Sequence, residues 1–76
     1  MNPQRLITMA NEIGAFFAAS PDHEQAARDI ASHLKRFWDP RMRREIVALY
    51  RHGGEGLEEP VRKAVALLAE EPPPAG

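Results

Sequence analysis

The histidine and serine side chains of this sequence could in principle ligate a metal or attack a substrate, but their spacing argues against both. His23, His33 and His52 lie in separate segments, so no two of them have the i, i+4 spacing that places two metal ligands on one helix face. Ser20 and Ser32 have no evident base that could activate a hydroxyl. We therefore expect no catalytic residue, no metal site and no cofactor site in this chain.

The rest of the sequence pattern favours binding of another molecule over catalysis. The stretch from Ser32 to Ile46, S-H-L-K-R-F-W-D-P-R-M-R-R-E-I, contains the only tryptophan and a proline corner. Six basic and two acidic residues lie between Lys35 and Arg51, a local charge of +4, and since the whole chain has a net charge of −1 the remainder carries −5. Arginine and tryptophan are enriched at binding hot spots. The pattern predicts a protein partner with an acidic or carbonyl-rich surface.

Seven residues of this stretch form the predicted partner-binding surface: Lys35, Arg36, Phe37, Trp38, Arg41, Arg43 and Arg44. Phe37 and Trp38 would supply apolar anchorage, and the arginines would form charge-assisted hydrogen bonds. Two points stay open. Trp38 either faces the partner or belongs to the core of the chain itself. Arg43 lies on an apolar helix flank, where it either has a partner or extends past Tyr50 to water.

Composition limits the class of protein to which the chain can belong. With 76 residues, 43% hydrophobic and 28% charged, the sequence is typical of one small globular domain rather than of a disordered chain. It contains no cysteine, which excludes disulfides and thiolate metal sites and favours a cytoplasmic location. No apolar run approaches the roughly 20 residues of a membrane span, and no signal-peptide core follows the first methionine.

Helical periodicity runs through most of the chain and predicts one all-α domain over residues 1–70, a small bundle of three main helices and a short fourth. The expected helices are at about 3–19, 21–38, 40–52 and 58–70. Residues 71–76, with three consecutive prolines, are expected to form a disordered tail.

Helix boundaries are marked by capping residues and prolines. Asn2 before Pro3, Ser20 before Pro21 and Asp39 before Pro40 each combine a capping side chain with a proline suited to the first helical position. Asp39 can accept a hydrogen bond from the amide of Arg41 or Met42. Gly53 offers the left-handed residue that closes the third helix.

The first predicted helix has an apolar arc wider than one neighbouring helix requires. Leu6, Ile13 and Phe17 lie at its centre and are expected in the core, whereas Met9 and Phe16 at its edge are candidates for contact with another protein. The isolated chain could therefore also form a homodimer through this face. Gly14 in mid-helix costs about 1 kcal/mol relative to alanine, which a close helix approach would explain.

Two segments together resemble a known family. The run H-L-K-R-F-W-D-P-R-M-R-R from His33 to Arg44, preceded by M-A-N-E-I-G-A-F-F at residues 9–17, resembles the delta subunit of soluble NAD-dependent formate dehydrogenases. The resemblance extends over most of the chain, from Arg5 to Leu68, and F-W-[DE]-P-R-M-R is its specific part. It implies a small non-catalytic subunit of a cytoplasmic molybdenum or tungsten enzyme that assembles or stabilises the complex.

The resemblance also implies where the cofactors of such a complex reside. The large alpha subunit carries molybdopterin guanine dinucleotide and iron–sulfur clusters, and the beta and gamma subunits carry flavin and further clusters. The present chain is expected to bind none of these and to bind the alpha subunit, in the same complex as beta and gamma.

Two other functions compete with this interpretation. A maturation chaperone would use the arginines to hold the phosphates of the molybdenum cofactor before its insertion. Nucleic-acid binding is suggested by Arg41, Arg44 and Arg51, which share one side of a helix. It is less favoured because the rest of the chain is acidic and has few side chains that read base edges. We expect neither nucleic acid nor a membrane as a partner.

Overall fold

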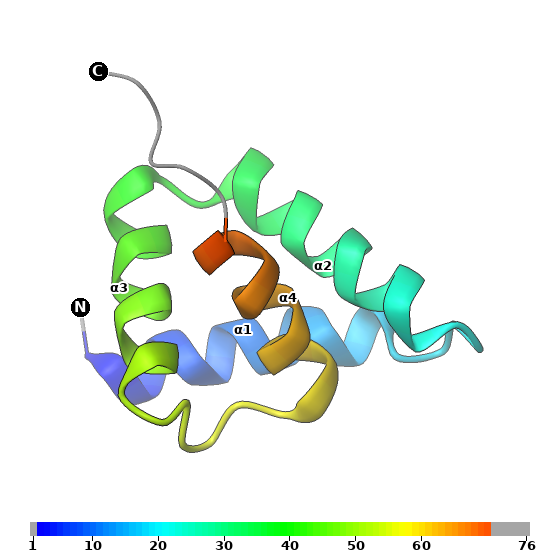
Figure 1. Ribbon diagram of the computed structural model, residues 1–76, viewed down its shortest axis with the longest axis horizontal. Coiled ribbons are helices and arrows are strands. Elements are labelled where there is room, and N and C mark those ends of the chain that lie inside the picture. Colours follow the sequence, from blue (N-terminus) through cyan, green and yellow to red (C-terminus); the bar gives the residue numbers. More distant parts are fainter. Residues whose placement is uncertain (1, 71–76) are drawn as a thin grey trace.

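The computed structural model describes residues 2–70, and within this range the chain forms four α-helices and no β-strand (Figure 1). The helices are α1 (Pro3–Phe17), α2 (His23–Phe37), α3 (Pro40–Arg51) and α4 (Glu59–Glu70). The all-α class predicted from periodicity is confirmed. The tail expected at 71–76 lies outside the described residues.

Helix α4 occupies the centre of the molecule, with α1, α2 and α3 packed around it (Figure 1). It is 12 residues long, the same length as α3, and its side chains Val61, Ala64 and Val65 are buried completely. The fourth helix, expected as a short addition to three main helices, is thus the element on which the other three pack.

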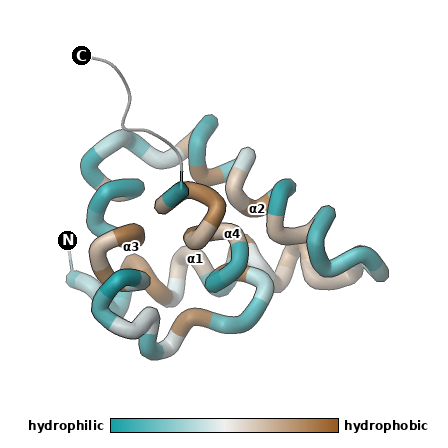
Figure 2. The backbone as a smooth tube through the Cα atoms, in the orientation of Figure 1, coloured by the Kyte–Doolittle hydropathy of each residue, from teal (hydrophilic) through white to brown (hydrophobic). Residues whose placement is uncertain are grey.

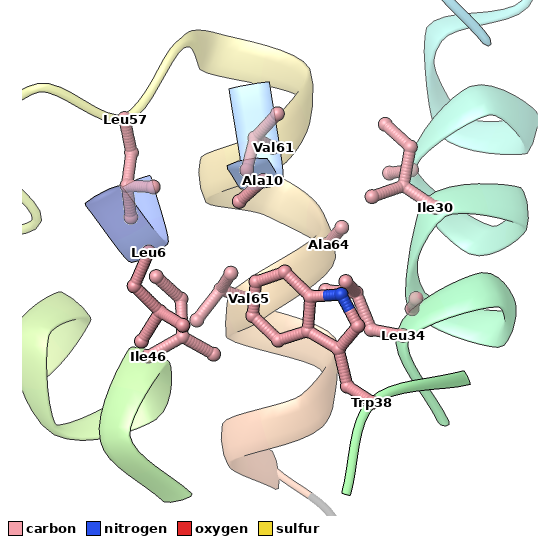
Figure 3. Packing of buried hydrophobic residues seen from close by; sticks show 12 residues of the cluster. Leu6, Ala10, Ile30, Leu34, Trp38, Ile46, Leu57, Val61, Ala64 and Val65 are labelled. Atoms are coloured by element: carbon pink, nitrogen blue, oxygen red, sulfur yellow. The ribbon is translucent and has the colours of Figure 1, made fainter. Parts of the chain in front are cut away.

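The core draws on all four helices and on the loop before α4. Figure 3 shows buried side chains of α1, α2 and α3 converging on α4. In Figure 2 the start of α3 is hydrophilic, while much of α4 is hydrophobic. The buried cluster consists of Leu6, Ala10, Ala27, Ile30, Ala31, Leu34, Trp38, Ile46, Leu57, Val61, Ala64 and Val65.

Gly14 allows α1 and α4 to approach closely, as its position in mid-helix predicted. A Cβ atom added at Gly14 would overlap with Cγ2 of Val61. Val61 is fully buried and β-branched, so its methyl group has little freedom to move aside. The contact therefore requires glycine.

Helix α2 begins two residues later than the sequence predicted. Ser20 is not its capping residue. Instead, Oδ1 of Asp22 accepts hydrogen bonds from the amides of Glu24 and Gln25, at 3.0 and 3.1 Å. A carboxylate that receives two amides at the positive end of a helix is a stronger cap than a hydroxyl, so Pro21 remains in the turn. Helix α1 correspondingly ends at Phe17 instead of residue 19.

The glycine-rich loop between α3 and α4 is fixed at both ends. Gly53 has a φ of +116° and, with Gly54, closes α3 through hydrogen bonds from their amides to the carbonyls of Tyr50 and Leu49. Nη1 and Nη2 of Arg62 donate to the carbonyls of Gly53 and Gly54, at 2.9 and 2.8 Å. This charge-assisted pair ties the loop to α4.

Asn11 of α1 holds the other end of this loop. Its Nδ2 donates to the carbonyl of Gly56 at 2.8 Å, and its Oδ1 accepts from the amide of Glu58 at 3.0 Å. The second bond satisfies an amide at the start of α4 that no earlier residue of that helix could satisfy. One side chain of α1 therefore caps the central helix.

Candidate functional site

The corner between α2 and α3 is formed by Trp38 and Asp39 alone. Trp38 leaves the helix with an extended backbone while its amide still donates to the carbonyl of Leu34 at 3.0 Å. Oδ1 of Asp39 accepts from the amide of Met42 at 2.9 Å, and Pro40 begins α3. The cap predicted at Asp39 is confirmed, and it fixes the angle at which the arginines of α3 follow the end of α2.

Trp38 belongs to the core, which decides between the two alternatives that the sequence left open. Its side chain is 7% exposed, and its indole ring lies among Leu34, Ala64 and Val65 (Figure 3). A partner could touch little of this ring without a rearrangement of the domain. We therefore remove Trp38 from the partner-binding surface and assign it to positioning the corner.

Phe37 has the opposite environment from its neighbour. Its ring is 71% exposed, although phenylalanine is among the residues most often buried. The ring is tilted by 42° against that of His33, one helical turn earlier, with 4.7 Å between the centroids. Phe37 is thus an apolar side chain presented at the surface of the corner.

Four cationic side chains surround this corner in an exposed position, namely Lys35, Arg36, Arg41 and Arg44. Lys35 and Arg36 lie in the last turn of α2, and Arg41 and Arg44 lie in the first turns of α3. The structure therefore brings together the predicted residues other than Trp38 on two successive helix ends. We call Lys35, Arg36, Phe37, Arg41, Arg43 and Arg44 the basic corner.

Arg43 differs from the other cations of the basic corner because it is half-buried. Within residues 2–70, its Nε atom is covered and has no hydrogen-bond acceptor. A covered donor without an acceptor costs free energy, and because this atom is covered, an acceptor from another molecule could reach it only if the side chain moved. Arg43 therefore differs from the exposed cations of the corner, which a partner can reach without rearrangement.

The three histidines do not meet. His23 and His52 are exposed, and Nδ1 of His52 lies 2.8 Å from the carbonyl of Ala48. Across the part of the chain that the structure describes, no three His, Cys, Asp or Glu side chains gather closely enough to hold a metal ion.

A surface feature that sequence reasoning only partly found is a row of rings that crosses from α1 to α2. We call Phe16, Phe17, His33 and Phe37 the aromatic row; its successive ring centroids are 5.4, 6.1 and 4.7 Å apart. Phe16 had been singled out at the edge of the first helix. The i, i+4 spacing of His33 and Phe37 was the signal that was overlooked.

Comparison with known proteins identifies the family. A family model described as NADH-dependent formate dehydrogenase delta subunit, FdsD, matches residues 5–65, a range that contains the entire basic corner. The chain belongs to this family. Searches of curated proteins and of solved structures gave no match.

Membership of the delta-subunit family agrees with the resemblance seen in the F-W-D-P-R-M-R run. The chain is thus a formate dehydrogenase delta subunit by family, and other subunits of such an enzyme are its expected partners. None of the helices within residues 2–70 is long and apolar enough to cross a membrane.

Proposed function

We propose that the chain is a non-catalytic accessory subunit that binds the large alpha subunit of an NAD-dependent formate dehydrogenase and stabilises or assembles it. The observation that supports this most directly is the exposure of Phe37 among the cations of the basic corner. Aromatic rings and arginines are residue types that are enriched at protein–protein interfaces.

The proposed contact uses each part of the corner differently. Phe37 enters an apolar depression of the partner, and Arg41 and Arg44 donate to carboxylates or carbonyls around it. The Arg43 side chain moves on binding, so that its Nε atom, covered in the isolated chain, meets an acceptor of the partner. Trp38 acts from within the core, because its burial fixes where α2 ends and where Phe37 emerges.

The proposal also assigns the redox chemistry to other subunits. In the complex, the molybdopterin guanine dinucleotide and iron–sulfur clusters belong to the alpha subunit, and flavin and further clusters belong to the beta and gamma subunits. We also propose that the complex, with this subunit, is cytoplasmic.

Co-purification of the assembled enzyme tests the proposal. Arg41→Ala combined with Arg44→Ala should abolish or strongly reduce recovery of the alpha subunit with the tagged chain, because two exposed hydrogen-bonding cations are lost. Substitutions at exposed sites change the free energy of unfolding by about 0.5 kcal/mol or less, so the isolated fold should persist.

A matched control is available on the same molecule. Arg28 and Lys63 are exposed cations outside the corner, and Arg28→Ala with Lys63→Ala removes the same charge. The control should co-purify like the wild type. Equal recovery of the alpha subunit with both double variants would contradict the role of the corner.

The maturation chaperone predicts a different measurement. In that role the isolated chain would bind molybdopterin guanine dinucleotide at low salt, and the Arg41 and Arg44 variant would lose this binding. Tight cofactor binding would replace the proposal of an accessory subunit by the proposal of a chaperone.

A further inference from the structure

Phe37 is the exposed ring of the basic corner, and its backbone and its ring are held by different neighbours. It is the last residue of α2, where helices tend to fray. The next side chain, Trp38, is buried, and the Trp38 amide donates to the carbonyl of Leu34 at 3.0 Å. The buried indole therefore fixes where Phe37 leaves the helix, but not the direction in which the Phe37 ring points.

The ring of Phe37 contacts His33, which lies one helical turn earlier. The two ring centroids are 4.7 Å apart and the ring planes are tilted by 42°. Side chains at i and i+4 share one helix face, and aromatic rings at this separation attract each other. A ring as exposed as that of Phe37 would otherwise exchange quickly between rotamers. The contact with His33 therefore restricts the directions that the Phe37 ring can take.

His33 is itself supported from the neighbouring helix. It is half-buried, and its ring meets that of Phe17 of α1 in a T-shaped arrangement, with 6.1 Å between the centroids. Phe17 is also half-buried and packs against the core. Within the aromatic row, a continuous series of ring contacts thus runs from the core through Phe17 and His33 to the exposed ring of Phe37.

A side chain that already points in its bound direction is a better anchor than a mobile one. When an interface immobilises a side chain, the loss of its rotamers costs free energy and lowers the affinity. A ring that is restricted before binding avoids part of this cost. The contact between His33 and Phe37 therefore favours binding even if the partner touches only Phe37.

We infer that His33 is a positioning residue of the partner-binding surface: by holding the ring of Phe37, it raises the affinity for the alpha subunit. This inference rests on the proposed function, because it takes Phe37 as the apolar anchor for that subunit. It adds a residue outside the basic corner, and through Phe17 it gives α1 a part in supporting the corner.

The ring contact can be measured in the isolated chain, without a partner. Phe37 is replaced by para-fluorophenylalanine, and fluorine nuclear magnetic resonance reports the ring current of the neighbouring imidazole. His33→Ala should move the resonance toward the position of a solvent-exposed fluorophenylalanine, whereas His33→Phe keeps a neighbouring ring and should leave it displaced from that position. An unchanged resonance in His33→Ala would overturn the inference.

Affinity for the alpha subunit is the second measurement. His33→Ala should weaken binding by roughly three- to tenfold, the range expected for one aromatic pair or one immobilised side chain. His33→Phe should restore most of the affinity, because it keeps a ring against Phe37. His23→Ala is the control, since His23 is an exposed histidine at the other end of the same helix. Circular dichroism verifies each fold, and His33→Gln replaces His33→Ala if the alanine variant does not fold.

A double-mutant cycle separates positioning from direct contact with the partner. In a Phe37→Ala background, His33→Ala should have no further effect on binding, because no ring remains to be held. An equal loss of affinity in both backgrounds would show that His33 acts through a contact of its own, and would overturn the inference.

The inference and the proposed function fail in distinguishable ways. If Phe37→Ala weakens binding and His33→Ala does not, the positioning role falls while the accessory function stands. If Phe37→Ala has no effect, Phe37 is not the anchor and the inference falls. The variant with Arg41→Ala and Arg44→Ala then decides whether the basic corner binds the alpha subunit without it.

Discussion

Gly14 is the residue at which a single atom decides how closely two helices pack. Gly14→Ala should lower the free energy of unfolding, because overpacking costs about 1–3 kcal/mol whereas alanine gains at most about 1 kcal/mol in helix propensity. Denaturation in urea followed by circular dichroism measures the change.

The clash with Val61 can be separated from the helix propensity by a double-mutant cycle. In a Val61→Ala background the methyl group that meets the new Cβ is absent. There, Gly14→Ala should become stabilising. The same destabilisation in both backgrounds would show that the contact between Gly14 and Val61 is not its cause.

Trp38 allows a direct test of its assignment to the core. Trp38→Ala should lower the free energy of unfolding by about 3–5 kcal/mol, a large part of the stability of a small domain. Trp38→Phe keeps a ring in the cluster and should cost less. An unchanged urea midpoint for Trp38→Ala would place the indole outside the core.

At the scale of helices and loops, Asn11 is a residue whose substitution should affect the structure at distant positions of the chain, namely Gly56 and Glu58. Asn11→Ala removes the hydrogen bonds to Gly56 and Glu58 and should cost about 1–2 kcal/mol. Hydrogen exchange should accelerate at the Glu58 amide and in the first turn of α4.

Two further substitutions provide an intermediate variant and a control for this experiment. Asn11→Asp keeps an acceptor for the Glu58 amide and loses the donor to Gly56, so its effect should be intermediate. Thr8→Ala serves as the control, because the Thr8 hydroxyl bonds only within α1, to the carbonyl of Gln4. Slow exchange at Glu58 in the Asn11→Ala variant would show that another group caps α4.

The helices themselves were largely predictable because their signals are local. Asn2, Asp39 and Gly53 act as caps where the sequence placed them. The start of α2 was misplaced because Ser20 and Asp22 are both suitable caps, and only the hydrogen bonds show which of them receives the amides. A sequence pattern ranks such candidates poorly when they lie two residues apart.

At the scale of the whole molecule, the unpredicted features all depend on how helices sit against one another. Trp38 and Phe37 are neighbours in sequence, yet Trp38 is buried beside α4 and Phe37 is exposed, and which of the two faces the core depends on where α4 packs. The aromatic row joins residues of α1 and α2, and Asn11 meets Glu58 across 47 positions. Periodicity within one helix contains no information about these distances.

The family assignment came from a different kind of signal. The F-W-D-P-R-M-R run combines a buried tryptophan, a cap and the exposed Arg41 in a few residues. Helical periodicity alone would have described any small bundle. The site residues predicted from this run stay a prediction until binding to the alpha subunit is measured.

The central position of α4 has a consequence for biosynthesis. The ribosome releases α1, α2 and α3 first, with Leu6, Ile30 and Ile46 turned toward a helix that has not yet emerged. Stable folding of the domain must therefore wait until residues 59–70 have left the exit tunnel. Until then the nascent chain exposes the apolar surface that chaperones recognise, and the basic corner has no fixed geometry to offer a partner. Binding should thus follow completion of the domain and not accompany its synthesis.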